Sequence, residues 1–127
     1  LIPTNPLRLD ELAWKFSSLK IVMCHTGGHW YQEAVQVLLR NPNIMTDIAA
    51  YNCTCETMVF PICSCGALIA RIAAIIGSDR MMFGTDNLIR DMNPDVVVQS
   101  SVSSMDAEKI LGLNAKHFFK LDEKVGY

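Results

Sequence analysis

The stretch Arg80-Met-Met-Phe-Gly-Thr-Asp86 decides how this chain is interpreted. Its three consecutive apolar residues, Met81 to Phe83, are typical of a short strand that is buried on both faces. Gly84 then allows a turn or a close approach of the backbone. Asp86 follows, so its carboxylate is expected at the carboxyl end of the strand, where parallel α/β folds collect ligands and catalytic groups.

A second stretch, Lys20-Ile-Val-Met-Cys-His25-Thr-Gly-Gly28, repeats this pattern, because an apolar strand again ends in an ionisable side chain followed by glycine. His25 and Asp86 are therefore predicted to lie at the rim of one active site. A neutral histidine nitrogen accepts protons near neutral pH, and a carboxylate oxygen is a ligand that zinc accepts. The structural alternatives are that Asp86 caps a turn and that His25 bonds to the backbone.

Apolar spacing predicts how the rest of the chain is organised. Helices are expected over 9–19, 30–40, 67–76, 104–111 and 114–121, and strands over 21–24, 44–49 and 81–83. The first helix has one apolar stripe, Ser103 or Ser104 caps a later one, and 95–101 is a weak helix or an extended segment. Loops are expected over 51–62 and 87–94. Alternating strands and helices predict an α/β fold with parallel strands and outer helices, and with more strands than the chain contains. The chain is therefore either a small three-layer domain or a piece of a larger sheet or barrel.

Composition narrows the class of protein. The chain has 127 residues, of which 50% are hydrophobic and 19% are charged, and this indicates one globular domain. A net charge of -2 gives no electrostatic reason to expect nucleic acid or an anionic membrane surface as a partner. No apolar run approaches the roughly 18 residues that cross a bilayer. Composition by itself does not indicate what the partner is.

The five cysteines allow two interpretations. Cys53, Cys55, Cys63 and Cys65 form two pairs that could make a zinc knuckle. Each pair has one intervening residue, whereas such sites usually have two to four. We therefore favour reduced thiols, which indicate a cytoplasmic protein.

Four motifs in order resemble the C-terminal part of the amidohydrolase-related family. This family is a branch of the metal-dependent hydrolases that includes several metal-dependent decarboxylases. The motifs are LKIVMCHTGGHW at 19–30, RNPNIMTDIA at 40–49, IGSDRMMFGTD at 76–86 and ILGLNAKHFFKL at 110–121. The family commonly continues its Gly-Thr-Asp with an aromatic residue and proline. Here Asn87 and Leu88 follow, so a different local pocket shape is expected.

The resemblance implies a fold. Members of the family are TIM (β/α)₈ barrels, and by this match the three strands correspond to the sixth, seventh and eighth. Residues 1–127 would then be a single partial domain of a larger barrel. The family's first-strand histidine pair and its strand-five metal ligand would lie upstream of Leu1.

The resemblance also implies roles for single residues. Asp86 matches a metal ligand that can take a proton from a metal-bound water. His25 matches a histidine that orients this water or a substrate oxygen, or that itself binds the metal, for which Zn²⁺ is expected. Asp47 is expected to be structural, through hydrogen bonds to neighbouring strand ends. His29 and His117 are expected to be surface or packing residues.

Two functions follow from the resemblance, and a third interpretation follows from the exposed edges of a three-stranded sheet. The first is hydrolysis of a small carbonyl or amide compound through a metal-activated water. The second is nonoxidative decarboxylation on the same scaffold. The third is a non-catalytic chain that self-associates as a homo-oligomer. The 127-residue chain alone is expected to have little or no activity, because two side chains are fewer than the three protein ligands of a typical catalytic zinc site.

Overall fold

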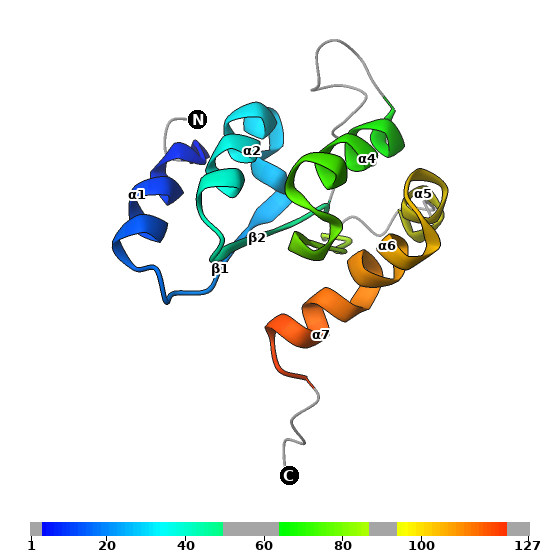
Figure 1. The fold of residues 1–127 in the computed structure, drawn as a ribbon. Helices are drawn as coiled ribbons and strands as arrows, with labels where there is room; N and C mark the ends of the chain where they lie inside the picture. The colour runs from blue at the N-terminus through cyan, green and yellow to red at the C-terminus, as the bar shows by residue number, and fades with distance from the viewer. Residues whose placement is uncertain (1–3, 50–63, 87–93, 122–127) are drawn as a thin grey trace.

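The computed structural model describes residues 4–49, 64–86 and 94–121, in which helices alternate with the strands of a small parallel sheet (Figure 1). The elements, in chain order, are α1 (Leu7–Lys15), β1 (Ile21–Met23), η2 (Cys24–Trp30), α2 (Tyr31–Arg40), β2 (Ile44–Asp47), α4 (Cys65–Ile76), η3 (Ser78–Arg80), β3 (Met81–Met82), α5 (Pro94–Ser101), α6 (Ser104–Glu108), η4 (Lys109–Leu113) and α7 (Asn114–Phe118). The predicted α/β class is confirmed.

The sheet has three strands in the order β1-β2-β3, and both pairs are parallel, as predicted. Met23 pairs with Thr46, and Thr46 pairs with Met81. All three carboxyl ends therefore lie at one edge of the sheet. β3 ends one residue earlier than predicted, because the N–H of Phe83 donates to the carbonyl of Ile110 in η4 at 2.8 Å.

The helices form an arc around the sheet (Figure 1). Along this arc α1 packs on α2, α2 packs on α4, and α4 packs on α5. The core lies between the helices and one face of the sheet. Its largest fully buried side chains include Leu38, Ile44, Ile69, Ile72, Met81 and Ile110. Successive strand–helix units that pack on their sequence neighbours are compatible with part of a TIM barrel.

The apolar stripe of the first predicted helix is mostly exposed. Ala13 is buried, but the exposed fractions of Leu12, Phe16 and Leu19 are 39%, 50% and 46%. Two physical reasons explain the difference. Among the described elements α1 packs mainly on α2, which covers one side of the helix. The helix also ends at Lys15, so the last two residues of the expected stripe lie beyond it.

Several element boundaries differ from the predictions. α4 begins at Cys65 because the side chain of Ser64 accepts a hydrogen bond from the N–H of Ala67. β2 ends at Asp47, two residues early. The segment with two predicted alternatives is helical, as α5. The predicted cap is confirmed at Ser103, which accepts the N–H of Asp106.

The predicted loops, 51–62 and 87–94, fall outside the described residues, except for Pro94, which is not in a loop but begins α5. Cys53, Cys55 and Cys63 also fall outside them, and with them the zinc-knuckle alternative. Cys65 is described, and it is the half-buried first residue of α4. Within the described ranges no helix is long and apolar enough to cross a membrane.

The amino edge of the sheet is held together by the Arg80 guanidinium. Its Nη1 donates to the carbonyl of Leu38 at 2.7 Å, and its Nη2 donates to the carbonyls of Asn41, at 2.7 Å, and Ile44. Burial lowers the pKa of Arg80, although a guanidinium remains charged at neutral pH. One arginine therefore joins the last turn of α2, the following turn and the start of β2.

Two asparagines extend this network along the amino edge. Asn43 donates to the carbonyls of Ala13, Phe16 and Leu19, at 3.2, 3.3 and 3.0 Å, and so ties the end of α1 to the start of β2. Asn114 donates to two further carbonyls, those of Ser78 and Met81. The Asn residues of two sequence motifs thus connect elements that are distant in sequence.

Candidate functional site

The turn after β1 has an unusual backbone. His25, Thr26, Gly27 and Gly28 all have positive φ, with values of 58°, 43°, 76° and 57°. Glycine adopts this region readily, whereas each non-glycine residue there costs about 1–2 kcal/mol. A Cβ on Gly27 would lie 2.8 Å from the Cβ of Ala34, so glycine is also required for space. The two glycines therefore serve the shape of the backbone in this turn.

The end of β2 holds this turn in place. Oδ1 of Asp47 accepts hydrogen bonds from the backbone N–H of His25, at 2.8 Å, and of Ala49, at 3.1 Å. Thr26 donates its hydroxyl to the backbone carbonyl of Asp47 at 3.0 Å, and Thr46 donates to the carbonyl of Met23 at 2.8 Å. The two bonds to the Asp47 carboxylate help to compensate for the strained backbone, because charge-assisted hydrogen bonds are stronger than neutral ones.

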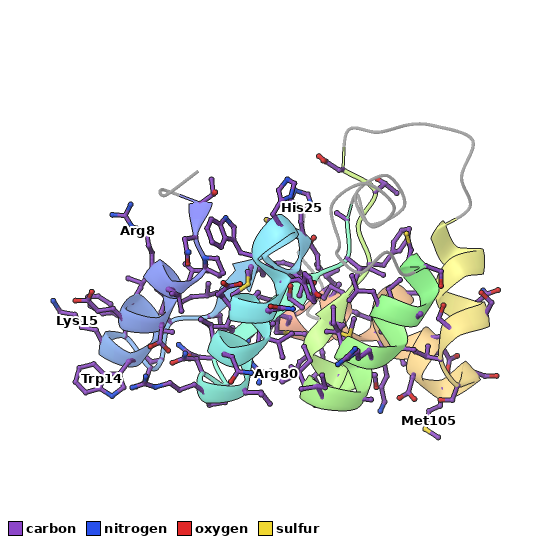
Figure 2. All side chains as sticks on the ribbon, turned by 90° about the horizontal axis from the view of Figure 1, so that it is seen from above. Arg8, Trp14, Lys15, His25, Arg80 and Met105 are labelled. Carbon is purple, nitrogen blue, oxygen red and sulfur yellow. The ribbon has the colours of Figure 1, made fainter. Side chains whose placement is uncertain are left out.

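The imidazole of His25 is oriented by a carbonyl. Its Nδ1 lies 2.9 Å from the carbonyl oxygen of Ala49. A carbonyl can only accept, so Nδ1 carries the proton, and in the neutral ring Nε2 has a lone pair. Nε2 lies 4.0 Å from Oδ2 of Asp86, at the exit of β3. Figure 2 shows His25 at one edge of the sheet and Arg80 toward the opposite edge.

Asp86 resembles His25 in its backbone. Its φ is 56°, so, like His25 and Thr26, it is a non-glycine residue in the left-handed region after a strand. A Cβ on Gly84 would lie 3.0 Å from the Cβ of Ala49, so the exits of β3 and β2 pack closely, as predicted for this glycine. This packing brings Asp86 toward His25. Their side chains are 42% and 40% exposed, so both can reach a ligand from solvent.

The His25–Asp86 separation suits a small bridging group. A distance of 4.0 Å is too long for a direct hydrogen bond, but one water can bond to both atoms at ordinary lengths. The two atoms are also of the types that zinc accepts. Within the described residues, however, no cluster of three or more His, Cys, Asp or Glu could hold a metal ion. His25 and Asp86 thus fit a metal as two members of a larger ligand set.

Cys24 adjoins these groups but is not suited to be a nucleophile. The residue as a whole is exposed, yet partial burial of its thiol is the largest of the causes that raise the pKa of Cys24. The carboxylates of Asp47 and Asp86 raise it further. The thiol is therefore protonated at neutral pH, whereas thiolate chemistry requires a lowered pKa.

A hollow of about 440 Å³ opens beside His25. It lies between the segment that precedes α1, the strand β1 and the turn η2. Its lining includes Asn5, Arg8, Val22, His29 and Trp30. Trp30 thus forms part of the wall of this hollow. His117 lies on α7 and is exposed, as expected.

Sequence reasoning missed how Asp47 contacts His25. Asp47 was expected to bond neighbouring strand ends, and it does so. The pairing register was the missing information. It places Met23 opposite Thr46, and hence the residues that follow β1, Cys24 and His25, beside the end of β2. The carbonyl of Ala49 has no signal in the sequence, because every residue carries one.

His25 and Asp86, whose side chains are of the kinds that bind metals, thus follow two parallel strands at one edge of an α/β sheet. The family model described as Amidohydrolase matches residues 1–121, and the chain belongs to this amidohydrolase family. Comparison with curated proteins and with solved structures found no match. Membership supports a hydrolase-type or related function, and this family generally binds metal ions.

Proposed function

We propose that His25 and Asp86 are site residues of a metal-dependent amidohydrolase that hydrolyses a small carbonyl or amide compound. One observation carries the proposal. Nε2 of His25 and Oδ2 of Asp86 lie 4.0 Å apart at the exits of two parallel strands. Both residues have left-handed backbone conformations, and such strain in non-glycine residues is concentrated at functional sites.

Each residue has a role in this proposal. Zinc, when bound, supplies a Lewis acid that lowers the pKa of water to about 7. Asp86 contributes Oδ2 as a ligand and as a proton acceptor. His25 accepts a hydrogen bond at Nε2, or binds the metal through it, while Nδ1–H stays on the carbonyl of Ala49. The hollow next to His25 is the proposed site for the substrate.

The remaining ligands are proposed to come from outside these residues. In our proposal residues 1–127 are one partial domain, and β1, β2 and β3 are strands six, seven and eight of a barrel. A second copy of the chain in a homo-oligomer is the alternative source of ligands. The chain alone would then have little activity. The partner is a small-molecule substrate rather than nucleic acid or membrane, and the cytoplasm is the proposed location.

One observation favours nonoxidative decarboxylation as the second candidate. Arg8 lines the hollow beside His25, and a guanidinium is a suitable partner for a substrate carboxylate. Benzoate can serve as the probe, with Trp30 fluorescence as the signal in a Trp14→Phe background. Saturable quenching that Arg8→Gln abolishes favours the decarboxylase. If Arg8→Gln leaves the signal unchanged, the hydrolase is favoured.

Zinc binding tests the main proposal. We expect calorimetry on the 127-residue chain to show a weak site, and Asp86→Ala and His25→Ala to reduce its affinity at least tenfold, since each removes a ligand. Asp79→Ala is the control, because Asp79 precedes β3 at the opposite edge of the sheet. Zinc affinity that is unchanged in both site variants would contradict the proposal. The mass in solution, measured alongside, tests the homo-oligomer.

A further inference from the structure

We infer that Asp47 is the positioning residue for His25. Its carboxylate holds the strained turn and thereby fixes the imidazole with Nδ1 protonated and Nε2 bare toward Asp86. The importance of this orientation for activity rests on the proposed function. The orientation itself does not, because it follows from contacts among His25, Asp47 and Ala49.

The first step concerns the backbone. Oδ1 of Asp47 receives two N–H groups, from His25 at 2.8 Å and from Ala49 at 3.1 Å. The Asp47 side chain is only 17% exposed, so water competes weakly for these bonds. His25 has φ 58°, a conformation that persists only where its surroundings determine it. The carboxylate is the group that receives the N–H of this strained residue.

The second step concerns the ring. Nδ1 of His25 lies 2.9 Å from the carbonyl of Ala49, whose own N–H is held by Asp47. One carboxylate therefore positions both the residue that carries the ring and the residue that orients it. Oδ1 of Asp47 is 3.8 Å from Nδ1, too far to accept its proton but near enough to favour a proton on that side. Nε2 is left facing Asp86 at 4.0 Å.

A purely structural role for Asp47 makes a different prediction. If the carboxylate served only to end β2, its removal would lower stability without changing which nitrogen of His25 carries the proton. The tautomer of His25 is therefore the measurement that separates the two roles.

The experiment uses the 127-residue chain with ¹⁵N-labelled histidine, freed of metal by EDTA and held at a pH where the imidazoles are neutral. Long-range ¹H–¹⁵N correlations report the tautomer of each ring, and His29 and His117 serve as internal references. We expect Nδ1–H for His25 in the wild-type chain. Asp47→Ala should give a mixture of tautomers, and exchange of the His25 and Ala49 amides should become about tenfold faster or more.

Asp47→Asn provides the rescue, because its amide oxygen accepts the same two N–H groups. It should keep the Nδ1–H tautomer even if Asp47→Ala fails to fold. Asp79→Asn, the control, should change neither signal. An Nε2–H tautomer in the wild type or in Asp47→Asn would overturn the inference, as would an unchanged tautomer in folded Asp47→Ala. If instead the proposed function is wrong, Asp86→Ala will not change the affinity for zinc. The tautomer of His25 and the exchange of the His25 and Ala49 amides would still be as inferred here.

Discussion

The two edges of the sheet use similar polar residues in opposite ways. At the amino edge, Arg80, Asn43 and Asn114 donate to backbone carbonyls of the helix ends, turns and strand starts. The backbone of the carboxyl edge is strained, and His25 and Asp86 direct Nε2 and Oδ2 toward one another across 4.0 Å. The first edge therefore contributes mainly stability, and the second exchanges some stability for polar atoms that remain within reach of solvent.

The largest expected effect is at the amino edge. Arg80→Met removes the donor to three carbonyls, so the free energy of unfolding should fall by about 3–4 kcal/mol. Urea denaturation measures the change. Arg71→Met, an exposed position on α4, is the matched control and should stay within about 0.5 kcal/mol of wild type. If the two variants lose equal stability, the amino edge does not have the role described above.

The next effect is at the carboxyl edge. Gly27→Ala must place a Cβ 2.8 Å from that of Ala34 at a φ of 76°, so a loss of about 2–3 kcal/mol is expected. Gly112→Ala is its control, because nothing lies within 4 Å of the added methyl group. This control should be neutral or stabilising by up to about 1 kcal/mol. Thermal melting measures the stability of both variants. If Gly27→Ala is as stable as Gly112→Ala, the turn tolerates alanine and the assignment is wrong.

A smaller effect of opposite sign is expected at Asp86. Asp86→Gly relieves the left-handed strain and should be more stable than Asp86→Ala by about 1 kcal/mol, while both lose zinc affinity. The pair isolates the backbone contribution, since both substitutions remove the carboxylate. Equal unfolding free energies in urea would mean that this position is not strained.

The smallest effect is a change in reactivity. The pKa of Cys24 is raised above its ordinary value by burial and by the carboxylates of Asp47 and Asp86. Alkylation of Cys24, followed by peptide mass spectrometry, should therefore be slow below pH 9 and accelerate only above it. Asp47→Asn should shift this rise to lower pH. The same raised pKa means that the thiol's contribution to stability is present at neutral pH and is lost as the pH rises through the folded-state pKa. A rise centred below pH 9 in the wild type would contradict the assignment.

Sequence patterns predicted the order of the elements and the two rim residues. Short apolar runs and helical spacing are local signals, so β1, β2 and β3 were predicted to within two residues at each end. His25 and Asp86 followed from their positions after strands. Their proximity required the parallel order, which alternation of strands and helices also supplied.

The contacts that could not be predicted depend on three-dimensional geometry. Positive φ at His25 and Asp86 has no sequence signal, because non-glycine residues seldom adopt it. The role of Arg80 depends on which carbonyls surround it, and the exposure of Leu12 depends on what packs against α1. Each is decided by neighbours that are distant in sequence.

The bond from Phe83 N–H to the carbonyl of Ile110 has a consequence for the time course of folding. During synthesis the N–H of Phe83 has this partner only after Ile110, 27 positions later, has been added to the chain. The hydrogen bond of Lys20 forms later still, because its ammonium group donates to the carbonyl of Phe118, 98 residues further along the chain. Such distant contacts raise the contact order and slow folding. The rim beside Asp86 is therefore expected to become rigid late, after the helices at the front of the chain have formed.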